Sequence, residues 1–241
     1  NGCVSTSEEV TVQQTSTNFA VSAISKTTSF ILTGETKSLK IEHNAVNASV
    51  KWFKDDIEIE NSNKNQIEIL VPGVYKAKVT GGSSCASSKD SPEFTVNKIV
   101  SLTTYINVDA AYQSCESNSA KLEVSTILVT DSQNQEYTLI ESQFTYLDFN
   151  WFKNGTIINS SLSKDLLLNN FDENGVYFLE VTSKTVKSNS NEIDVKLSLP
   201  IISLASSSVS NIICDDISIE LSTSNNINYN YQWFRNNILI P

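Results

Sequence analysis

Val50-Lys51-Trp52-Phe53-Lys54 returns twice along the chain, as Phe-Asn-Trp-Phe-Lys at residues 149–153 and as Tyr-Gln-Trp-Phe-Arg at residues 231–235. These three copies contain every tryptophan of the sequence, namely Trp52, Trp151 and Trp233. A large ring inside an alternating apolar run is typical of a strand that places one anchor in a core. Three copies of such a strand predict a tandem repeat.

A second marker follows the first two tryptophans. Gly73-Val74-Tyr75 and Gly175-Val176-Tyr177 each open a run in which every second residue from the tyrosine is apolar, which predicts a half-buried strand after a turn. A tyrosine in this place of a sandwich packs its ring in the core and returns its hydroxyl to the backbone of the preceding turn, as a tyrosine corner. We assign that role to Tyr75 and Tyr177, with an ordinary half-buried strand tyrosine as the alternative.

Composition narrows the class of protein. The 241 residues hold 27 acidic and 17 basic side chains, for a net charge of -10, so the chain lacks the basic footprint of a nucleic-acid binder. No apolar run reaches the roughly 20 residues of a membrane span. There is no methionine and no secretory signal, so we expect a mature or internal fragment of a longer protein.

The markers set a repeat frame along the chain. We expect the tail of one module in residues 1–14, a complete module in 15–98, a second in 99–198 and an incomplete third in 199–241. Cys115 lies 36 residues before Trp151, whereas Cys214 lies 19 before Trp233, so the second module carries an insertion of 17 residues, placed near 127–146. Its Tyr137-Thr138-Leu139-Ile140 run indicates a hairpin. The third module lacks a Gly-x-Tyr strand, so we expect Trp233 to be mobile unless more chain or a neighbour covers it.

Short alternating runs predict the strands of the first complete module. Glutamates alternate with Ile57 and Ile59, and again with Ile67 and Ile69, as expected when each of two sheets buries one face. The predicted strands are 28–33, 37–42, 49–54, 57–60, 65–70, 73–80 and 93–98. About seven short strands with turns every 8–12 residues predict an all-β fold of tandem immunoglobulin-like β-sandwich modules.

With these motifs the chain resembles the immunoglobulin-like repeats of very large Bacteroidetes surface proteins. The shared pattern is Trp-Phe-Lys/Arg-Asn, then Gly-x-Tyr, then a Cys-x-Ser closing strand, and it covers essentially the whole sequence. The resemblance implies a cell-surface or gliding-motility adhesin that is exported by type IX secretion. The family module tends to carry an early and a late cysteine. The module at 15–98 has the late Cys85 but not the early one, and the module at 99–198 has the early Cys115 but not the late one.

The resemblance bears on the cysteines. Cys3 and Cys214 match positions whose partners would lie in modules that the sequence does not include. Cys85 and Cys115 are complementary orphans of neighbouring modules, so one hypothesis is a disulfide that stiffens the joint between them. The alternatives are unpaired thiols or thiols paired elsewhere, because sequence does not show whether their Cα atoms approach within about 7 Å.

The sequence shows no catalytic or cofactor-binding motif. The single histidine, His43, lies in a polar stretch without a marked acid or nucleophile, and no phosphate-binding loop is present. Asp55, Asp56, Glu58 and Glu60 form the densest acidic group, but their spacing matches no calcium loop. We therefore expect no catalytic residue, no cofactor and no metal site.

Three functions remain open from the sequence. The first is a non-catalytic spacer and interaction scaffold in a long extracellular or cell-surface adhesin or filament. Its partners are neighbouring modules of the same chain and an extracellular protein or glycan, with no nucleic acid and no membrane span. The second is a set of accessory modules attached to a secreted enzyme. The third is a ligand-binding module that recognises its target through the insertion, in which Tyr137, Phe144 and Tyr146 would form an exposed row or belong to the core.

Overall fold

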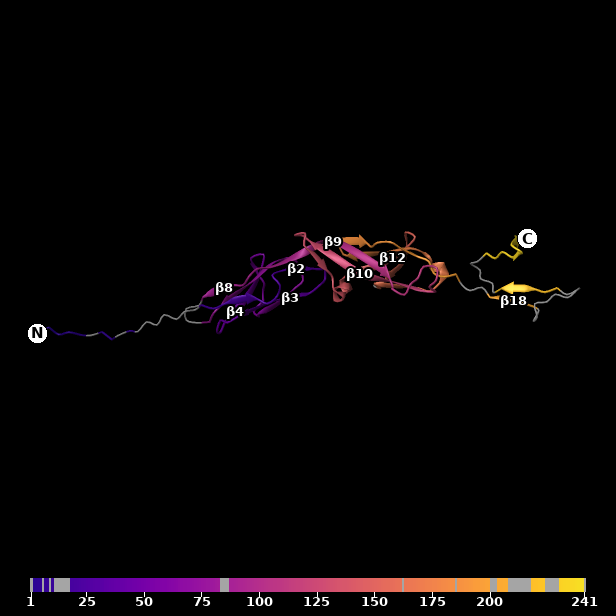
Figure 1. Ribbon diagram of the computed structural model, residues 1–241. Coiled ribbons are helices and arrows are strands. Elements are labelled where there is room, and N and C mark those ends of the chain that lie inside the picture. Colours follow the sequence, from indigo (N-terminus) through magenta and orange to yellow (C-terminus); the bar gives the residue numbers. More distant parts are fainter. Residues whose placement is uncertain are drawn as a thin grey trace.

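A computed structural model describes most of the chain (Figure 1). The described residues are 2–5, 7–8, 10, 18–82, 87–161, 163–184, 186–199, 203–207, 218–223 and 230–240. Strands dominate them, and the helical content is limited to two short 3-10 turns, η1 (Glu141–Tyr146) and η2 (Phe171–Glu173). The prediction of an all-β fold is confirmed.

The first sandwich packs two sheets around one core. One sheet has the order β1-β3-β6, and the other runs β5-β4-β7-β9, with β8 added to β7 and β2 pairing in parallel with β9. This pairing order is that of an immunoglobulin-like sandwich. Its strands are β1 (Val21–Ala23), β2 (Thr28–Ile31), β3 (Lys37–His43), β4 (Ser49–Lys54), β5 (Ile57–Glu58), β6 (Gln66–Ile69), β7 (Gly73–Thr80), β8 (Ser88–Asp90) and β9 (Phe94–Val108).

The second sandwich repeats this plan. One sheet contains β9, β10 and β11 with β14 beside β10, and the other has the order β13-β12-β15-β16 with β17 beside β15. The two sandwiches follow one another end to end in Figure 1. The new strands are β10 (Ala120–Asp131), β11 (Glu136–Thr138), β12 (Asp148–Lys153), β13 (Thr156–Ser161), β14 (Asp165–Leu168), β15 (Gly175–Ser183), β16 (Val186–Asn189) and β17 (Ile193–Val195).

The third unit is described in part. Its strands β18 (Leu204–Ser206) and β19 (Leu221–Thr223) form one antiparallel pair, and β20 (Phe234–Arg235) and β21 (Ile238–Leu239) form a hairpin. Trp233 lies directly before β20 and is half-buried, whereas Trp52 and Trp151 are completely buried.

The two sequence markers pack against each other in both sandwiches. Lys54 pairs with Tyr75 across β4 and β7, and Lys153 pairs with Tyr177 across β12 and β15. Each lysine therefore lies over the glycine that opens the tyrosine strand, so that a Cβ on Gly73 would stand 2.8 Å from Lys54 Cε. The repeated basic residue and the repeated glycine thus form one contact, at the end of a strand pair that buries the tryptophan two residues before the lysine.

Both tyrosines adopt the corner geometry. Tyr75 Oη donates a hydrogen bond to the carbonyl oxygen of Val71 (2.7 Å), and Tyr177 Oη donates to that of Glu173. Both rings are almost fully buried. Burial, with the nearby Glu173 carboxylate, raises the pKa of Tyr177 to about 12.

The strands predicted for residues 28–80 agree with the structure within a few residues at each end, except that β5 ends at Glu58. Two short strands, β1 and β8, were not predicted. The strand predicted at 93–98 does not end there, because β9 continues to Val108.

Candidate functional site: the two ends of the second sandwich

A single strand joins the two sandwiches without a linker. Residues 94–98 of β9 pair with β7 and β2 of the first sandwich, and residues 99–108 pair with β10 of the second. The pairing therefore passes from one sandwich to the next, at the place that we call the first junction. A backbone held by hydrogen bonds on both sides of a junction resists bending far more than a free linker does.

Residues 127–146, the stretch predicted as an insertion and called the insertion below, form the other half of the first junction. Its β11 pairs with the end of β10, which confirms the predicted hairpin, and η1 follows. The ring of Tyr137 lies 4.8 Å from that of Phe30 in the first sandwich, measured between centroids. Phe30 and Leu32 are buried in the core of the second sandwich rather than in that of the first.

Asp131 is the polar centre of this junction. Its side chain is completely buried, and Asn97 of β9 donates a hydrogen bond to it (Nδ2 to Oδ2, 2.7 Å). The backbone N–H groups of Gln133 and Gln135 donate to Oδ1 at 2.8 and 2.9 Å, and the Tyr137 hydroxyl donates to Oδ2 at 3.3 Å. Burial alone would raise the pKa of Asp131, but these hydrogen bonds outweigh it and hold the pKa below its usual value. The carboxylate thus ties the turn of the insertion to the shared strand.

A second carboxylate repeats this role from the opposite side. Glu35 of the first sandwich is nearly buried and accepts the backbone N–H of Leu32 at 2.8 Å through Oε2. Gln143 of the insertion donates to the other oxygen, Oε1, at 3.0 Å. Each sandwich therefore contributes one buried acid whose hydrogen bonds close the junction.

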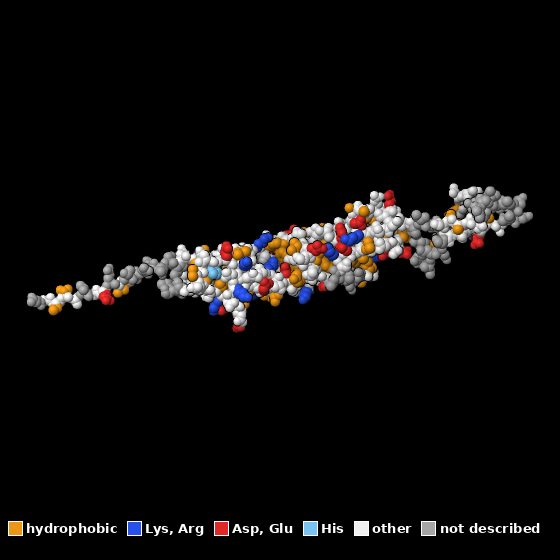
Figure 2. Space-filling model, turned by 90° about the horizontal axis from the view of Figure 1, so that it is seen from below, with side chains coloured by type: hydrophobic (Ala, Val, Ile, Leu, Met, Phe, Trp, Pro, Cys, Tyr) orange, Lys and Arg blue, Asp and Glu red, His pale blue; other side chains and the backbone are white. Residues whose placement is uncertain are grey.

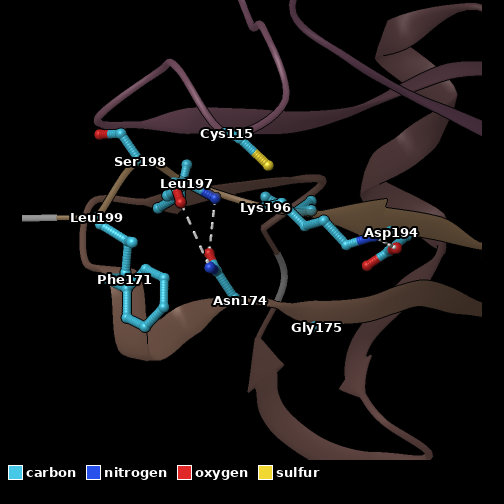
Figure 3. Close-up of a pocket in the computed structure, with 10 residues that line it drawn as sticks. Cys115, Phe171, Asn174, Gly175, Asp194, Lys196, Leu197, Ser198 and Leu199 are labelled. Carbon is cyan, nitrogen blue, oxygen red and sulfur yellow. Dashed lines mark hydrogen bonds and ion pairs between the residues drawn. The ribbon is translucent and has the colours of Figure 1, made fainter. Parts of the chain in front are cut away.

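The far end of the second sandwich is open instead. A pocket of about 760 Å³ lies there, and we call it the distal pocket (Figure 3). Val195 and Leu197 are buried at its base, whereas Leu199 is 70% exposed, and the ring of Phe171 lies beside Leu199 in the close-up. The pocket is lined by Cys115, Phe171, Asn174, Gly175, Asp194, Val195, Lys196, Leu197, Ser198 and Leu199.

Polar groups around the distal pocket bond to one another. The Asn174 side chain accepts the backbone N–H of Leu197 at 2.7 Å, which holds the chain in line after β17 has ended. Lys196 pairs with Asp194 at 2.8 Å, and Ser198 Oγ donates to Asn118. The remaining surface of the pocket is apolar.

The distal pocket and the first junction occupy equivalent places in the two sandwiches. Gly73 pairs with Val96, and Gly175 pairs with Val195, so Lys196 and Leu197 stand at the positions of Asn97 and Lys98. Cys115 donates its backbone N–H to Lys196, much as β2 runs beside Asn97 and Lys98 in the first sandwich. At the first junction the insertion fills this place.

Four of the residues examined for chemistry in the sequence, His43, Asp55, Asp56 and Glu58, have structural partners. His43 lies at the end of β3, where its Nε2 is 3.1 Å from Asn65 Oδ1. Asp55 and Asp56 bond to Lys54 and Lys76, and Glu58 pairs with Lys51 at 2.8 Å. No group of three or more metal-binding side chains occurs within the described ranges. Along the face in Figure 2, acidic and basic side chains are interspersed.

The cysteine hypothesis keeps the status of a prediction. Cys115 is a free, exposed thiol at the rim of the distal pocket, and Cys3 is also free and exposed. Cys85 and Cys214 lie outside the described residues. The residues that flank Cys85 are held within the first sandwich, since Gly82 donates its N–H to Val46 and Gly81 donates to Ser87.

The three aromatic side chains proposed for recognition are half-buried. Tyr137, Phe144 and Tyr146 all pack against the core of the second sandwich, and Tyr146 also lies near Gly34 of the first. They correspond to the core alternative of the sequence analysis and do not form an exposed row. Their register next to Phe30 and Gly34 was not recognisable from sequence, because those contacts join residues more than 100 positions apart.

Comparisons with known proteins give no family for this chain. No protein-family model and no curated protein matches the sequence. The chain is similar to the three N-terminal domains of the Hoc outer capsid protein of bacteriophage RB49, at 17% identity and a TM-score of 0.43, covering 87% of this chain and 71% of that one. It is also similar to the four N-terminal immunoglobulin domains of Dscam1 isoform 6.9, at 18% identity, a TM-score of 0.33 and coverages of 71% and 44%.

Fibronectin(III)-like modules of CbhA from Clostridium thermocellum show a similar relation, at 15% identity, a TM-score of 0.31 and coverages of 74% and 95%. These scores are low, and the strand pairing described above is what defines the chain as tandem immunoglobulin-like β-sandwiches. None of the helices in the described part of the chain has the length and apolar character needed to span a bilayer.

Proposed function

We propose that this chain is a stiff, non-catalytic spacer and interaction scaffold within a long secreted or cell-surface adhesin or filament. The observation that carries the proposal is the continuous strand β9, which joins two sandwiches end to end. Each sandwich has its own core around a buried tryptophan, so length is gained by adding copies. A spacer needs this combination, because a flexible linker at each joint would shorten the reach of the array.

Two further observations support a scaffold over an enzyme. Asp55, Asp56 and Glu58 are paired with lysines. The carboxylates of Asp131 and Glu35 are instead used to close the first junction. The aromatic side chains of the insertion pack at the first junction. They are therefore not displayed for recognition of a ligand. The sequence resemblance to Bacteroidetes surface repeats supports the extracellular location, with type IX export and a gliding or adhesive role as its most specific form.

The size of the native product tests this proposal. An antibody raised against residues 18–199 would be used to measure the product on source cells and in the medium. We expect a surface-bound product of several hundred kilodaltons that gives a ladder on mild proteolysis. A secreted product of two or three times the mass of this chain would instead favour accessory modules beside one enzyme, and the spacer would be abandoned.

A further inference from the structure

The cysteines of the chain occupy two repeated positions. The early cysteines stand seven residues before a strand leucine, Leu122 of β10 or Leu221 of β19. The late cysteines each begin a Cys-x-Ser stretch that continues with Ser or Thr, and the late cysteine of the first sandwich follows its tyrosine strand. The early cysteines are Cys115 and Cys214, and the late cysteines are Cys3 and Cys85.

The early position of a sandwich faces the sandwich that follows. Leu39 of the first sandwich corresponds to Leu122 of the second. Their cross-strand partners, Ile67 and Leu166, both lie 15 residues after the tryptophan of their own sandwich. Seven residues before Leu39 stands Leu32, whose side chain is completely buried in the core of the second sandwich. The residue at the early position of the first sandwich thus reaches into the next one.

Cys115 takes the early position of the second sandwich. Its backbone N–H donates to the carbonyl oxygen of Lys196 at 2.7 Å, directly after β17 has ended, and its thiol is exposed and free. The thiol therefore stands where the chain leaves the second sandwich. This is the place from which Leu32 reaches the following module in the first sandwich.

The late position of a sandwich lies at its opposite end. Cys85 itself is outside the described residues, but it is only two positions before Ser87 in sequence. The carbonyl oxygen of Ser87 accepts the N–H of Gly81, directly after β7 has ended. A Cβ on Gly81 would stand 3.7 Å from Phe19, next to the start of this sandwich. The first junction is at the other end of β7, where Gly73 pairs with β9.

The late position of the second sandwich belongs to the first junction. The late cysteine of the first sandwich stands three residues before the strand partner of Thr80, and the corresponding residue is Lys184, three before the partner of Thr182. Thr182 also pairs with Asp148, two residues after the end of the insertion. The early position of the first sandwich and the late position of the second therefore lie at one junction.

Neither of these two positions carries a cysteine. They are occupied by Leu32 and Lys184, and the shared strand and two buried carboxylates hold this junction instead. A bond between the early and late positions of one sandwich would have to span the eight residues of β7, about 24 Å at a rise of about 3.4 Å per residue. The Cα atoms of a disulfide lie within about 7 Å of each other. Pairing across a junction avoids this span, and it accounts for the loss of both cysteines at the same junction.

We propose that Cys115 forms a disulfide with the late cysteine of the module that follows, so that the bond crosses the junction after the second sandwich. The inference deepens the proposed spacer function and rests on it for the following module. It corresponds to the alternative, left open by the sequence, of thiols paired elsewhere. By the same rule, the partner of Cys85 is an early cysteine of the preceding module.

The bond requires the oxidation of two thiols. Each sulfur loses its hydrogen and the S–S bond forms, while the two electrons and two protons reduce a disulfide oxidant to two thiols. Such a bond persists in the oxidising surroundings of a secreted or cell-surface protein. It links two modules covalently at an end of the sandwich where β17 stops and leaves no shared strand.

Disulfide mapping of the native product tests the pairing. The product from source cells would be alkylated without reduction, digested, and analysed by mass spectrometry before and after reduction. We expect the peptide that contains Cys115 to be joined to a peptide that follows the next Gly-x-Tyr strand of the chain. An alkylated Cys115 would overturn the proposal, and so would a bond from Cys115 to Cys3, Cys85 or Cys214.

Mild proteolysis of variants gives a second measurement. After a cut between residues 199 and 203, the two sides should stay joined without reductant in the natural protein, whereas Cys115→Ser should let them separate. The matched control is Cys214→Ser, which removes the other early cysteine and should leave the two sides joined. Equal behaviour of the two variants would contradict the pairing. A small native product that carries the Cys115 bond would remove only the spacer role, and a free Cys115 in a very large product would remove only this inference.

Discussion

The two ends of the second sandwich show two ways of ending the same fold. At the first junction β9 runs on for 15 residues, and the insertion covers Phe30 and Leu32. At the distal end β17 stops at Val195, the chain is held by the Asn174 side chain, and an apolar pocket stays open. The sandwiches themselves are alike, so the difference lies in one insertion and in the length of one strand.

That difference teaches where stiffness comes from in this chain. A sandwich core is local and would form equally well beside a flexible joint. The insertion and the uninterrupted ladder add contacts that belong to neither core alone, and they make two modules into one mechanical unit.

Removing the contact between Phe30 and Tyr137 should weaken the first junction and should have the largest effect on the free energy of unfolding. Phe30→Ala deletes a ring that is 7% exposed and lies 4.8 Å from Tyr137, which leaves a cavity between the sandwiches. We expect a loss of about 4 kcal/mol in the free energy of unfolding. Urea denaturation, followed by tryptophan fluorescence, would measure it.

The control for this variant is Leu167→Ala, which removes an exposed side chain and should change the free energy of unfolding by less than about 0.5 kcal/mol. The comparison between the two ends of the second sandwich would lose its basis if the two variants behaved alike. It would be sharpened if Phe30→Ala split the unfolding into two transitions.

Much of the fold was accessible from the sequence because its signals are local. The Trp52 and Trp151 strands, the tyrosine strands and the hairpin of the insertion each follow from residue alternation over fewer than ten positions. The short strands β1 and β8 gave no such signal, since three residues do not establish a period. In the sequence, the strand β9, which both sandwiches share, is also indistinguishable from two short strands on either side of a module boundary.

The junction was less predictable than the fold for a physical reason. From the sequence, Asp131 is an ordinary aspartate in a polar turn. Its importance to the junction comes from its hydrogen bond with Asn97, which is 34 positions away. Glu35 and Gln143 are separated by 108 positions. Such pairs arise from the docking of two domains, and no local pattern encodes them. The distal pocket likewise depends on the place where β17 ends.

Neutralising Asp131, the buried acid of the first junction, should lower the free energy of unfolding by a moderate amount. Asp131→Asn keeps the shape but removes the charge that accepts hydrogen bonds from Asn97, Gln133, Gln135 and Tyr137. We expect a loss of about 2 kcal/mol in the free energy of unfolding at neutral pH, because hydrogen bonds to a charged group are the stronger ones. Thermal denaturation would measure it.

At acid pH, Asp131→Asn and the natural sequence should have the same free energy of unfolding. The folded pKa of Asp131 lies below its ordinary value, so its contribution is complete above about pH 4 and is lost as the pH falls through the folded pKa. The matched control at the distal pocket is Asp194→Asn, which removes a half-exposed ion pair with Lys196 and should have no measurable effect. A difference that persists unchanged below pH 2 would contradict the assignment.

The smallest expected effect compares the tyrosine corners of the two sandwiches. Tyr177→Phe and Tyr75→Phe each remove one buried hydrogen bond to a turn and should cost about 1 kcal/mol in the free energy of unfolding. Base should weaken both corners, because burial raises the pKa of Tyr75 as well. The pKa of Tyr177 is raised to about 12, above the unfolded value of about 10, so its stabilisation is present below pH 10 and is lost as the pH rises toward 12. Tyr177→Phe should therefore flatten the alkaline limb of a stability–pH curve between about pH 10 and 12, and an unaltered limb would show that this corner is not what titrates beside the distal pocket.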